Sequence, residues 1–379
     1  MTPFAITTPP RILFGRGRAA GAPALVAALG ARGLVIHGAN AARAGWLVDG
    51  LRALGCDVLA LPCADEPCLT LLEATVATAR PHRPDWVVGL GGGAAMDLAK
   101  AVAALIPAPG GAMDHLEVVG RGLPLTAAPL PFVAIPTTSG TGAEVTRNAV
   151  IGLPEHGRKV SLRDDRMVAR LAIVDPALTD RTPWAVTLAS GLDAVTQVIE
   201  PYLSGKATPY TDAIARPAIA PGLAALMRLH GAEDPAARDA LAWTSVCGGL
   251  ALANGGLGAV HGLAGVIGGR TGAAHGAICG ALLAPVLAAN RRGANPAIAA
   301  RIDEVCGLIA PHLGCAPADA PATLAAWVRG AGLPSLSALG LDPALHAQVA
   351  AESLVSSSMK GNPVPLGVGD LVAIMVAAG

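Results

Sequence analysis

The sequence is poor in aromatic side chains and in charge. Aromatic residues make up 3% of the 379 residues and charged residues 14%, and the 27 basic residues equal the 27 acidic ones. A nucleic-acid-binding surface needs an excess of positive charge, so we do not expect nucleic acid as a partner. With few rings available for stacking, the chain favours a small or aliphatic ligand.

Long, strongly apolar runs are lacking as well, although 53% of the residues are hydrophobic. Stretches such as GLALANGGLGAV are broken by Gly and Asn before they reach the roughly 20 residues that span a bilayer. The beginning, MTPFAITTPPRILFG, lacks a basic segment followed by an apolar core. We therefore expect neither a signal peptide nor a membrane partner.

Cysteines are few and scattered. There are seven, an odd number, and the closest pair, Cys63 and Cys68, matches no common zinc motif. We interpret them as free thiols in a reducing cytoplasm.

Strand-like and helix-like segments alternate in the first half of the chain. The strand-like runs are RGLVIHG, PDWVVGLGGG, FVAIPTT and LAIVDPALT. The helical segments between them are PALVAALGA, AGWLVDGLRALG, LTLLEATVATAR and MDLAKAVAALI. From about Thr182 the strand signals stop and helical patterns follow, separated by Gly, Pro and Asn breaks. The pattern predicts a doubly wound α/β domain over residues 1–180 and an all-helical domain over residues 181–379.

Two loops at strand ends are typical of a phosphate or nucleotide site. In VVGLGGGAAMDLAK a triple glycine separates a strand from a helix, whose free N–H groups would face a pyrophosphate. In AIPTTSGTGAEVTRNAVI several small hydroxyl residues follow a strand and could bond a polar ligand. Either segment could instead be a plain turn, and two together favour a ligand more than one does.

Five motifs in order resemble the iron-containing, or group III, alcohol dehydrogenases, a superfamily that includes maleylacetate reductases. They are GLGGGAAMDLAK, IPTTSGTGAEVT, LAIVDPALT, GLDAVTQVIEPYLS and GLGAVHGLAG with AAHGA. The resemblance implies a dehydroquinate-synthase-like fold, with an α/β dinucleotide-binding domain, an all-α domain and an active site in the cleft between them. It also implies a homodimer and hydride transfer between a nicotinamide coenzyme, NADP or NAD, and a small alcohol or carbonyl compound.

The resemblance also assigns coenzyme residues. Gly91, Gly92, Gly93 and Ala94 would hold the pyrophosphate. The other positions that line the coenzyme are Asp97, Thr137, Thr138, Thr141, Asn148, Lys159 and Leu178.

Coenzyme preference depends on the end of LVIHGANAARAG. In the family that the sequence resembles, members that prefer NAD have an Asp at the end of this strand. The Asp accepts a hydrogen bond from the ribose 2′-hydroxyl and would repel a 2′-phosphate. Gly38 stands at this position, while Asn40 and Arg43 nearby could meet a phosphate. We therefore favour NADP. Arg43 is equally well explained as an ordinary exposed helix residue.

The family's divalent metal, iron or zinc, would be held by Asp193, Gln197, His261 and His275, where Gln197 replaces a histidine. Gly265 replaces a further histidine near the substrate. An amide oxygen is a weak ligand, but one carboxylate and two imidazoles still form a minimal set. Gln197 could add a fourth oxygen, or it could bond Asp193 or the substrate.

Three functions remain open on these residues. With a metal, the chain would be a metal-assisted dehydrogenase, with His261, His275 or ordered water replacing the usual proton route. Without one, the same histidines could polarise a carbonyl group, as in a maleylacetate-type reductase. The third hypothesis is a nucleotide-binding protein that has lost its catalytic activity. A dehydroquinate-synthase-like activity is disfavoured, because the helical half has few Lys and Arg for an anionic sugar acid.

Overall fold

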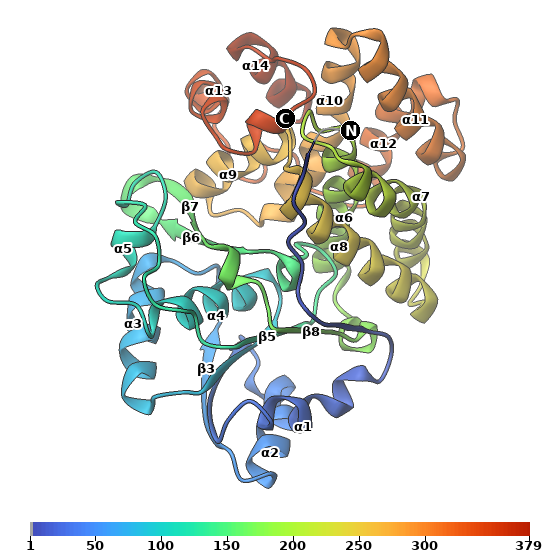
Figure 1. Ribbon diagram of the computed structural model, residues 1–379. Helices are drawn as coiled ribbons and strands as arrows, with labels where there is room; N and C mark the ends of the chain where they lie inside the picture. Colours follow the sequence, from blue (N-terminus) through green and yellow to red (C-terminus); the bar gives the residue numbers. More distant parts are fainter. Residues whose placement is uncertain (1–2) are drawn as a thin grey trace. The chain divides into compact units, whose positions relative to one another are not determined.

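The computed structural model describes residues 3–379, and the chain folds into two compact units (Figure 1). The α/β unit consists of Thr7–Thr138 and Ala143–Asp180. The helical unit consists of Arg181–Gly379, residues 3–6 and Ser139–Gly142. The predicted fold class, an α/β part followed by an all-helical part, is confirmed.

A six-stranded parallel sheet forms the centre of the α/β unit. Its strands, in spatial order, are β1 (Ile12–Phe14), β8 (Leu171–Val174), β5 (Phe132–Pro136), β4 (Trp86–Gly91), β2 (Arg32–Gly38) and β3 (Asp57–Cys63). The chain runs outward from β2 to β3 and then returns to place β4 on the other side of β2. The carboxyl ends of β2 and β4 therefore lie at a topological switch point, where open α/β sheets bind ligands.

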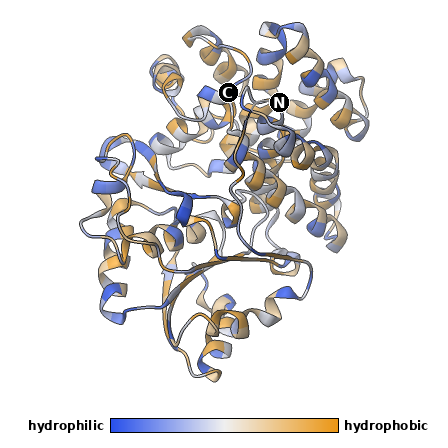
Figure 2. Ribbon diagram, viewed as in Figure 1, coloured by the Kyte–Doolittle hydropathy of each residue, from blue (hydrophilic) through white to orange (hydrophobic). Residues whose placement is uncertain are grey.

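Helices cover both faces of this sheet. Alternate residues of β2 point to opposite sides: Val35 packs with α1 (Ala22–Ala27) and α2 (Gly45–Ala53), whereas Leu34 packs with α3 (Leu69–Ala79) and α4 (Gly93–Leu105). Because both sides of the strands are buried, the strands read as nearly continuous apolar runs. The hydrophobic colouring of β5 and β8 in Figure 2 agrees with this.

Four strands went unrecognised in the sequence, namely β1, β3 and an antiparallel hairpin. The hairpin joins β6 (Asn148–Leu153) to β7 (Arg158–Arg163) and turns at Gly157, whose φ is 56°. A short helix, α5 (Ala112–His115), completes the regular helices of this unit.

A buried lysine fixes the connection between β5 and β6. Lys100 of α4 is 1% exposed, and its ammonium donates to the carbonyl oxygens of Ala143 and Asn148 at 2.7 and 2.8 Å and to Thr146 Oγ1 at 2.8 Å. Burial lowers the pKa of Lys100 to about 8, although Asp97 and then Glu144 act in the opposite direction. Three acceptors in this connection therefore share one donor, and the Ala143 oxygen also accepts from Thr146 Oγ1 at 3.3 Å.

The helical unit is built around α6. Its helices are α6 (Trp184–Leu203), α7 (Pro209–Gly231), α8 (Pro235–Gly255), α9 (Ala259–Thr271), α10 (His275–Gly293), α11 (Pro296–Leu313), α12 (Ala320–Gly330), α13 (His346–Leu354) and α14 (Val368–Ala377). Prolines do not always end these helices as the sequence suggested. The helix α7 continues through Pro217 and Pro221, and α6 continues through Pro201.

Glycines allow the helices around α6 to approach one another closely. A Cβ at Gly276 of α10 would lie 2.3 Å from the carbonyl oxygen of Ala189, and one at Gly280 would lie 2.6 Å from Leu192 Cδ1. On α8, a Cβ at Gly248 would lie 2.8 Å from Gln197 Cβ. Side chains at these positions would push α8 and α10 away from α6.

Within residues 3–379, no single helix is long and apolar enough to cross a bilayer. Only the pair α8 and α9 reaches the required length and composition together, and the two are bent by 99° at the break between them.

We predict that Lys100→Met destabilises the protein. Removing the ammonium takes a donor from Thr146 Oγ1 and from the carbonyl oxygens of Asn148 and Ala143, and only Thr146 Oγ1 still donates to the Ala143 oxygen, so the free energy of unfolding should fall by at least about 2 kcal/mol. Urea unfolding followed by circular dichroism measures the change. The exposed Lys360→Met is the control and should alter stability by less than about 0.5 kcal/mol. Equal stability of the two variants would show that these hydrogen bonds do not hold the connection.

Candidate functional site

Three polar residues lie on one face of α6, the helix at the centre of the helical unit. Asp193, Gln197 and Glu200 follow one another at intervals of four and three residues, which places them on one side of the helix. Their exposed fractions are 1%, 2% and 6%. Buried carboxylates require partners, so this face determines what must pack against it.

His261, near the start of α9, lies between the two carboxylates. Its Nδ1 is 2.6 Å from Glu200 Oε2, and its Nε2 is 3.3 Å from Asp193 Oδ1. The other Glu200 oxygen accepts from the Val260 N–H at 2.7 Å. Glu200 therefore fixes the imidazole ring and directs Nε2 toward Asp193.

His261 Nε2 and Asp193 Oδ1 lie at ion-pair distance, and the geometry of the contact is not that of a hydrogen bond. Among the described residues, neither His261 Nε2 nor Asp193 Oδ1 has a hydrogen-bond partner, and both atoms are fully buried. Gln197 Oε1, one turn further along α6, is also buried and forms no hydrogen bond with the described residues. Buried polar atoms without hydrogen bonds, two of them facing each other at ion-pair distance, are expected of a site that receives a ligand.

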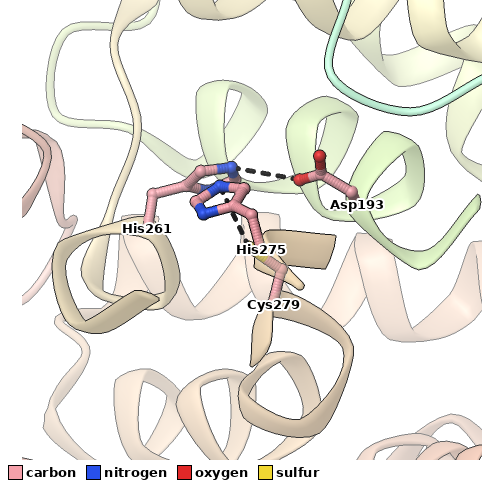
Figure 3. Close-up of side chains that lie close together, drawn as sticks. All are labelled: Asp193, His261, His275 and Cys279. Carbon is pink, nitrogen blue, oxygen red and sulfur yellow. Dashed lines mark hydrogen bonds and ion pairs between the residues drawn. The ribbon is translucent and has the colours of Figure 1, made fainter. Parts of the chain in front are cut away.

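Two residues of α10 complete the cluster. His275 begins this helix and Cys279 follows one turn later, with Cys279 Sγ 3.6 Å from His275 Nε2. One ligand atom each from Asp193, His261, His275 and Cys279 lie within 4.8 Å of one another. Figure 3 shows the four side chains directed toward one another from α6, α9 and α10.

The electrostatics of this cluster are strongly coupled. Burial raises the pKa of Asp193, but the neighbouring His261 and His275 outweigh this and hold the pKa of the carboxyl below its ordinary value. Burial lowers the pKa of His261, but Cys279, Asp193 and Glu200 together hold it well above the ordinary value. The pocket therefore favours an anionic carboxylate with positive charge beside it, whether from a proton or from a cation.

The structure brings together most of the predicted metal residues. Asp193, His261 and His275 converge, and Gln197 lies on the same face of α6. Gly265, on α9, has no atom within 4 Å of the position of a Cβ, so this place is open space. Sequence reasoning missed Cys279 and Glu200. Cys279 lies four residues after His275, and Glu200 lies seven residues after Asp193. These helical spacings place each residue on the same helix face as a predicted ligand and could have identified it.

The predicted pyrophosphate residues lie at the switch point of the sheet. Gly38 ends β2, Gly91 ends β4, and Thr137 follows β5 and donates its N–H to the Gly91 carbonyl oxygen at 2.8 Å. A Cβ on Gly91 would lie 2.7 Å from Ala95 Cβ and 3.3 Å from the backbone nitrogen of Gly38. These glycines permit close backbone approach between adjacent strand ends.

The glycine loop turns without left-handed residues. Gly91, Gly92 and Gly93 all have negative or extended φ, so their backbone conformation does not require glycine. Gly92 is the N-cap of α4, without a side-chain hydrogen bond to the helix, and a Cβ there would lie 3.2 Å from Thr138 Oγ1. The first N–H groups of α4, from Gly93 and Ala94 onward, therefore lie beside a backbone free of bulk.

The remaining predicted coenzyme residues are spread over several elements. Asp97 Oδ2 accepts from the Val150 N–H at 3.1 Å and so fixes β6 to α4. Asn148 begins β6, and Lys159 of β7 forms an ion pair with Glu66. Lys159 therefore already has a partner of opposite charge.

Thr141 belongs to the segment Ser139–Gly142, which packs with the helical unit. Gly142 has a φ of 60°, and a Cβ there would lie 2.5 Å from Gly249 Cα. Although Ser139–Gly142 follows β5 closely in the sequence, close backbone contact holds this segment against α8.

The two candidate phosphate-binding side chains near Gly38 have structural partners. Asn40 accepts from the Ala42 N–H at 3.0 Å and caps the following turn, and Arg43 donates to the Leu178 carbonyl oxygen at 2.9 Å. A Cβ on Gly38 would meet no atom within 4 Å. The end of β2 therefore carries no acid and has room for one.

Comparison with known proteins identifies relatives along the whole chain. The family model for iron-containing alcohol dehydrogenases matches residues 9–176, and the model for the C-terminal part of the Fe-containing alcohol dehydrogenase family matches residues 187–379. The NAD-dependent methanol dehydrogenase of Bacillus methanolicus is 33% identical over 343 residues, 88% of each chain. The solved structure of a 1,3-propanediol oxidoreductase covers both chains completely, with a TM-score of 0.88 and 27% identity.

Long-chain-alcohol dehydrogenase 1 of Geobacillus thermodenitrificans is 42% identical over 212 residues, which are 56% of this chain. The chain spans only 53% of that relative's length in this alignment. The matches to the two family models nevertheless extend over both units. The chain therefore belongs to the iron-containing alcohol dehydrogenase family.

Proposed function

We propose that this protein is an oxidoreductase that transfers hydride between a nicotinamide coenzyme and a small alcohol or the corresponding aldehyde or ketone. The observation that carries the proposal is the buried cluster of Asp193, His261 and His275, in which two polar atoms form no hydrogen bond with any residue of the described part of the chain. One relative is named an NAD-dependent methanol dehydrogenase and another a long-chain-alcohol dehydrogenase. The relatives thus differ in substrate length, and we propose the reaction class without a particular alcohol.

The cluster fits a divalent metal ion. A carboxylate and two imidazoles are a known ligand set for both zinc and iron(II), and Asp193 Oδ1 and His261 Nε2 face each other without a hydrogen bond and are available for it. When bound, such an ion would supply Lewis-acid polarisation of the alcohol or carbonyl oxygen. Glu200 would keep the His261 ring in the orientation that coordination needs.

The coenzyme would lie at the carboxyl ends of β2, β4 and β5. The N-terminus of α4 would face the pyrophosphate, and Gly91, Gly92, Thr137 and Thr138 would allow it to approach the backbone. Because no acid stands at Gly38, we propose that NADP is accepted at least as well as NAD.

A metal-independent reductase of activated carbonyl compounds is the second candidate. Gln197 favours it, because an amide oxygen is a weaker ligand than imidazole. Chelation separates the two candidates. Prolonged treatment with a chelator should abolish activity of the metal-assisted enzyme and leave that of the second candidate unchanged.

The reaction is tested with a panel of alcohols and aldehydes. We predict reduction of small aldehydes with NADPH or NADH, followed by coenzyme absorbance, and a loss of kcat/KM of about a hundredfold or more in Asp193→Asn. Asp303→Asn is the matched control, because its exposed ion pair with Arg291 contributes little. Absence of activity on the whole panel, with coenzyme still bound, would favour a protein that binds nucleotide without chemistry.

Gly92→Val should weaken coenzyme binding by about tenfold or more, because the added side chain stands where the pyrophosphate would approach the start of α4. The nearest atoms belong to the Thr138 side chain, which can rotate, so we expect the variant to fold. Fluorescence titration with NADPH measures the change. Gly111→Val is the control, since Gly111 is the N-cap of α5 and has open space around it. Unchanged affinity in Gly92→Val would mean that the loop is only a turn.

Gly38→Asp should shift coenzyme preference toward NADH. An acid at the end of β2 would accept from the ribose hydroxyl and repel a 2′-phosphate, changing the ratio of the two dissociation constants by about tenfold or more. Gly21→Asp, at another open position of the same unit, controls for added charge. A strong preference for NADH in the unmodified protein would contradict the assignment.

A further inference from the structure

Cys279 belongs to the buried cluster as closely as the predicted ligands do. The side chain is completely buried on α10, one helical turn after His275, so both point to the same side of the helix. Its Sγ lies 3.6 Å from His275 Nε2 and within 4.8 Å of the ligand atoms of Asp193 and His261. The other buried cysteines of the helical unit, Cys247 and Cys306, do not take part in this cluster.

The spacing within the cluster matches that of ligands around one ion. Zinc binds nitrogen and oxygen at about 2.0–2.2 Å and sulfur at about 2.3 Å, so the ligands of a tetrahedral site are roughly 3.3–3.8 Å apart. His261 Nε2 and Asp193 Oδ1 are 3.3 Å apart, and Cys279 Sγ and His275 Nε2 are 3.6 Å apart. The remaining separations, at most 4.8 Å, need only small side-chain rotations to close.

Two buried atoms that form no hydrogen bond point to a ligand independently of the thiol. Asp193 Oδ1 and His261 Nε2 are fully buried and, among the described residues, form no hydrogen bond. The two atoms face each other at 3.3 Å, and burying both costs free energy unless a proton or a cation is shared between them. Gln197 is a poor candidate to complete the set, because a neutral amide oxygen binds these metals weakly, whereas a thiolate binds zinc strongly.

We propose that the thiolate of Cys279 is the fourth protein ligand of a divalent metal, best matched by zinc, that Asp193, His261 and His275 also hold. The thiol proton is released to solvent as the sulfur–metal bond forms. Gln197 is then left free to contact a water or the substrate. The proposal rests on the proposed function only in placing a metal at this cluster.

Cobalt(II) titration of the full-length protein tests the proposal, because cobalt reports both coordination and the presence of sulfur. We expect one cobalt per chain, visible d–d bands of a four-coordinate site and a near-ultraviolet thiolate-to-cobalt charge-transfer band. In Cys279→Ser the charge-transfer band should vanish, and cobalt affinity should fall by about tenfold or more. Cys306→Ser, at a buried cysteine elsewhere in the helical unit, should keep both the band and the affinity.

X-ray absorption of the zinc-loaded unmodified protein gives the same answer even if Cys279→Ser does not fold. One sulfur at about 2.3 Å in the zinc shell supports the proposal. Cobalt bound with d–d bands but no thiolate band, and a zinc shell without sulfur, would overturn the role of Cys279 while leaving the metal site. Failure of the unmodified protein to bind cobalt or zinc would overturn this proposal together with the metal-assisted function, but aldehyde reduction in the presence of a chelator would still support an oxidoreductase.

Discussion

Two carboxylates buried on one face of α6 are the constraint on which the helical unit depends. Asp193 and Glu200 lie two turns apart with almost no exposure, and a buried charge without a partner costs several kcal/mol. His261 lies against both, with one ring nitrogen facing each. These contacts fix the position of α9 against α6, because the first turn of α9 also donates the Val260 N–H to Glu200. A histidine held in this way has a fixed ring plane, which is the property required of a metal ligand.

Small residues make this arrangement possible. Gly276 and Gly280 bring α10 so close to α6 that His275 and Cys279 reach the same point as Asp193. The ligands are therefore on helices rather than on loops, and rigid elements hold ligand geometry more accurately. In the α/β unit, glycine acts in a similar way at Gly91, where the ends of β4 and β2 approach each other closely.

Much of this could be predicted from the sequence, and the failures have physical causes. The buried strands β2, β4, β5 and β8 were predicted because their runs are apolar on both faces. The edge strand β3 contains Pro62, which is typical of a loop or a sheet edge, and it was missed. The hairpin β6–β7 was not predicted either, although buried residues alternate with less buried ones along its strands. Asp193, His261 and His275 were predicted through family motifs, and Cys279 was not, because a lone buried cysteine is ordinarily only a small apolar residue.

The central claim is that the buried cluster of Asp193, His261, His275 and Cys279 is a metal site to which each of the four side chains contributes a ligand. Anomalous diffraction from crystals of the full-length protein, collected on both sides of the zinc absorption edge, tests it most directly. The account predicts one strong peak, present only above the edge, surrounded by Asp193 Oδ1, His261 Nε2, a His275 nitrogen and Cys279 Sγ. A map without such a peak after growth with zinc, in which these four side chains satisfy one another by hydrogen bonds, would contradict it.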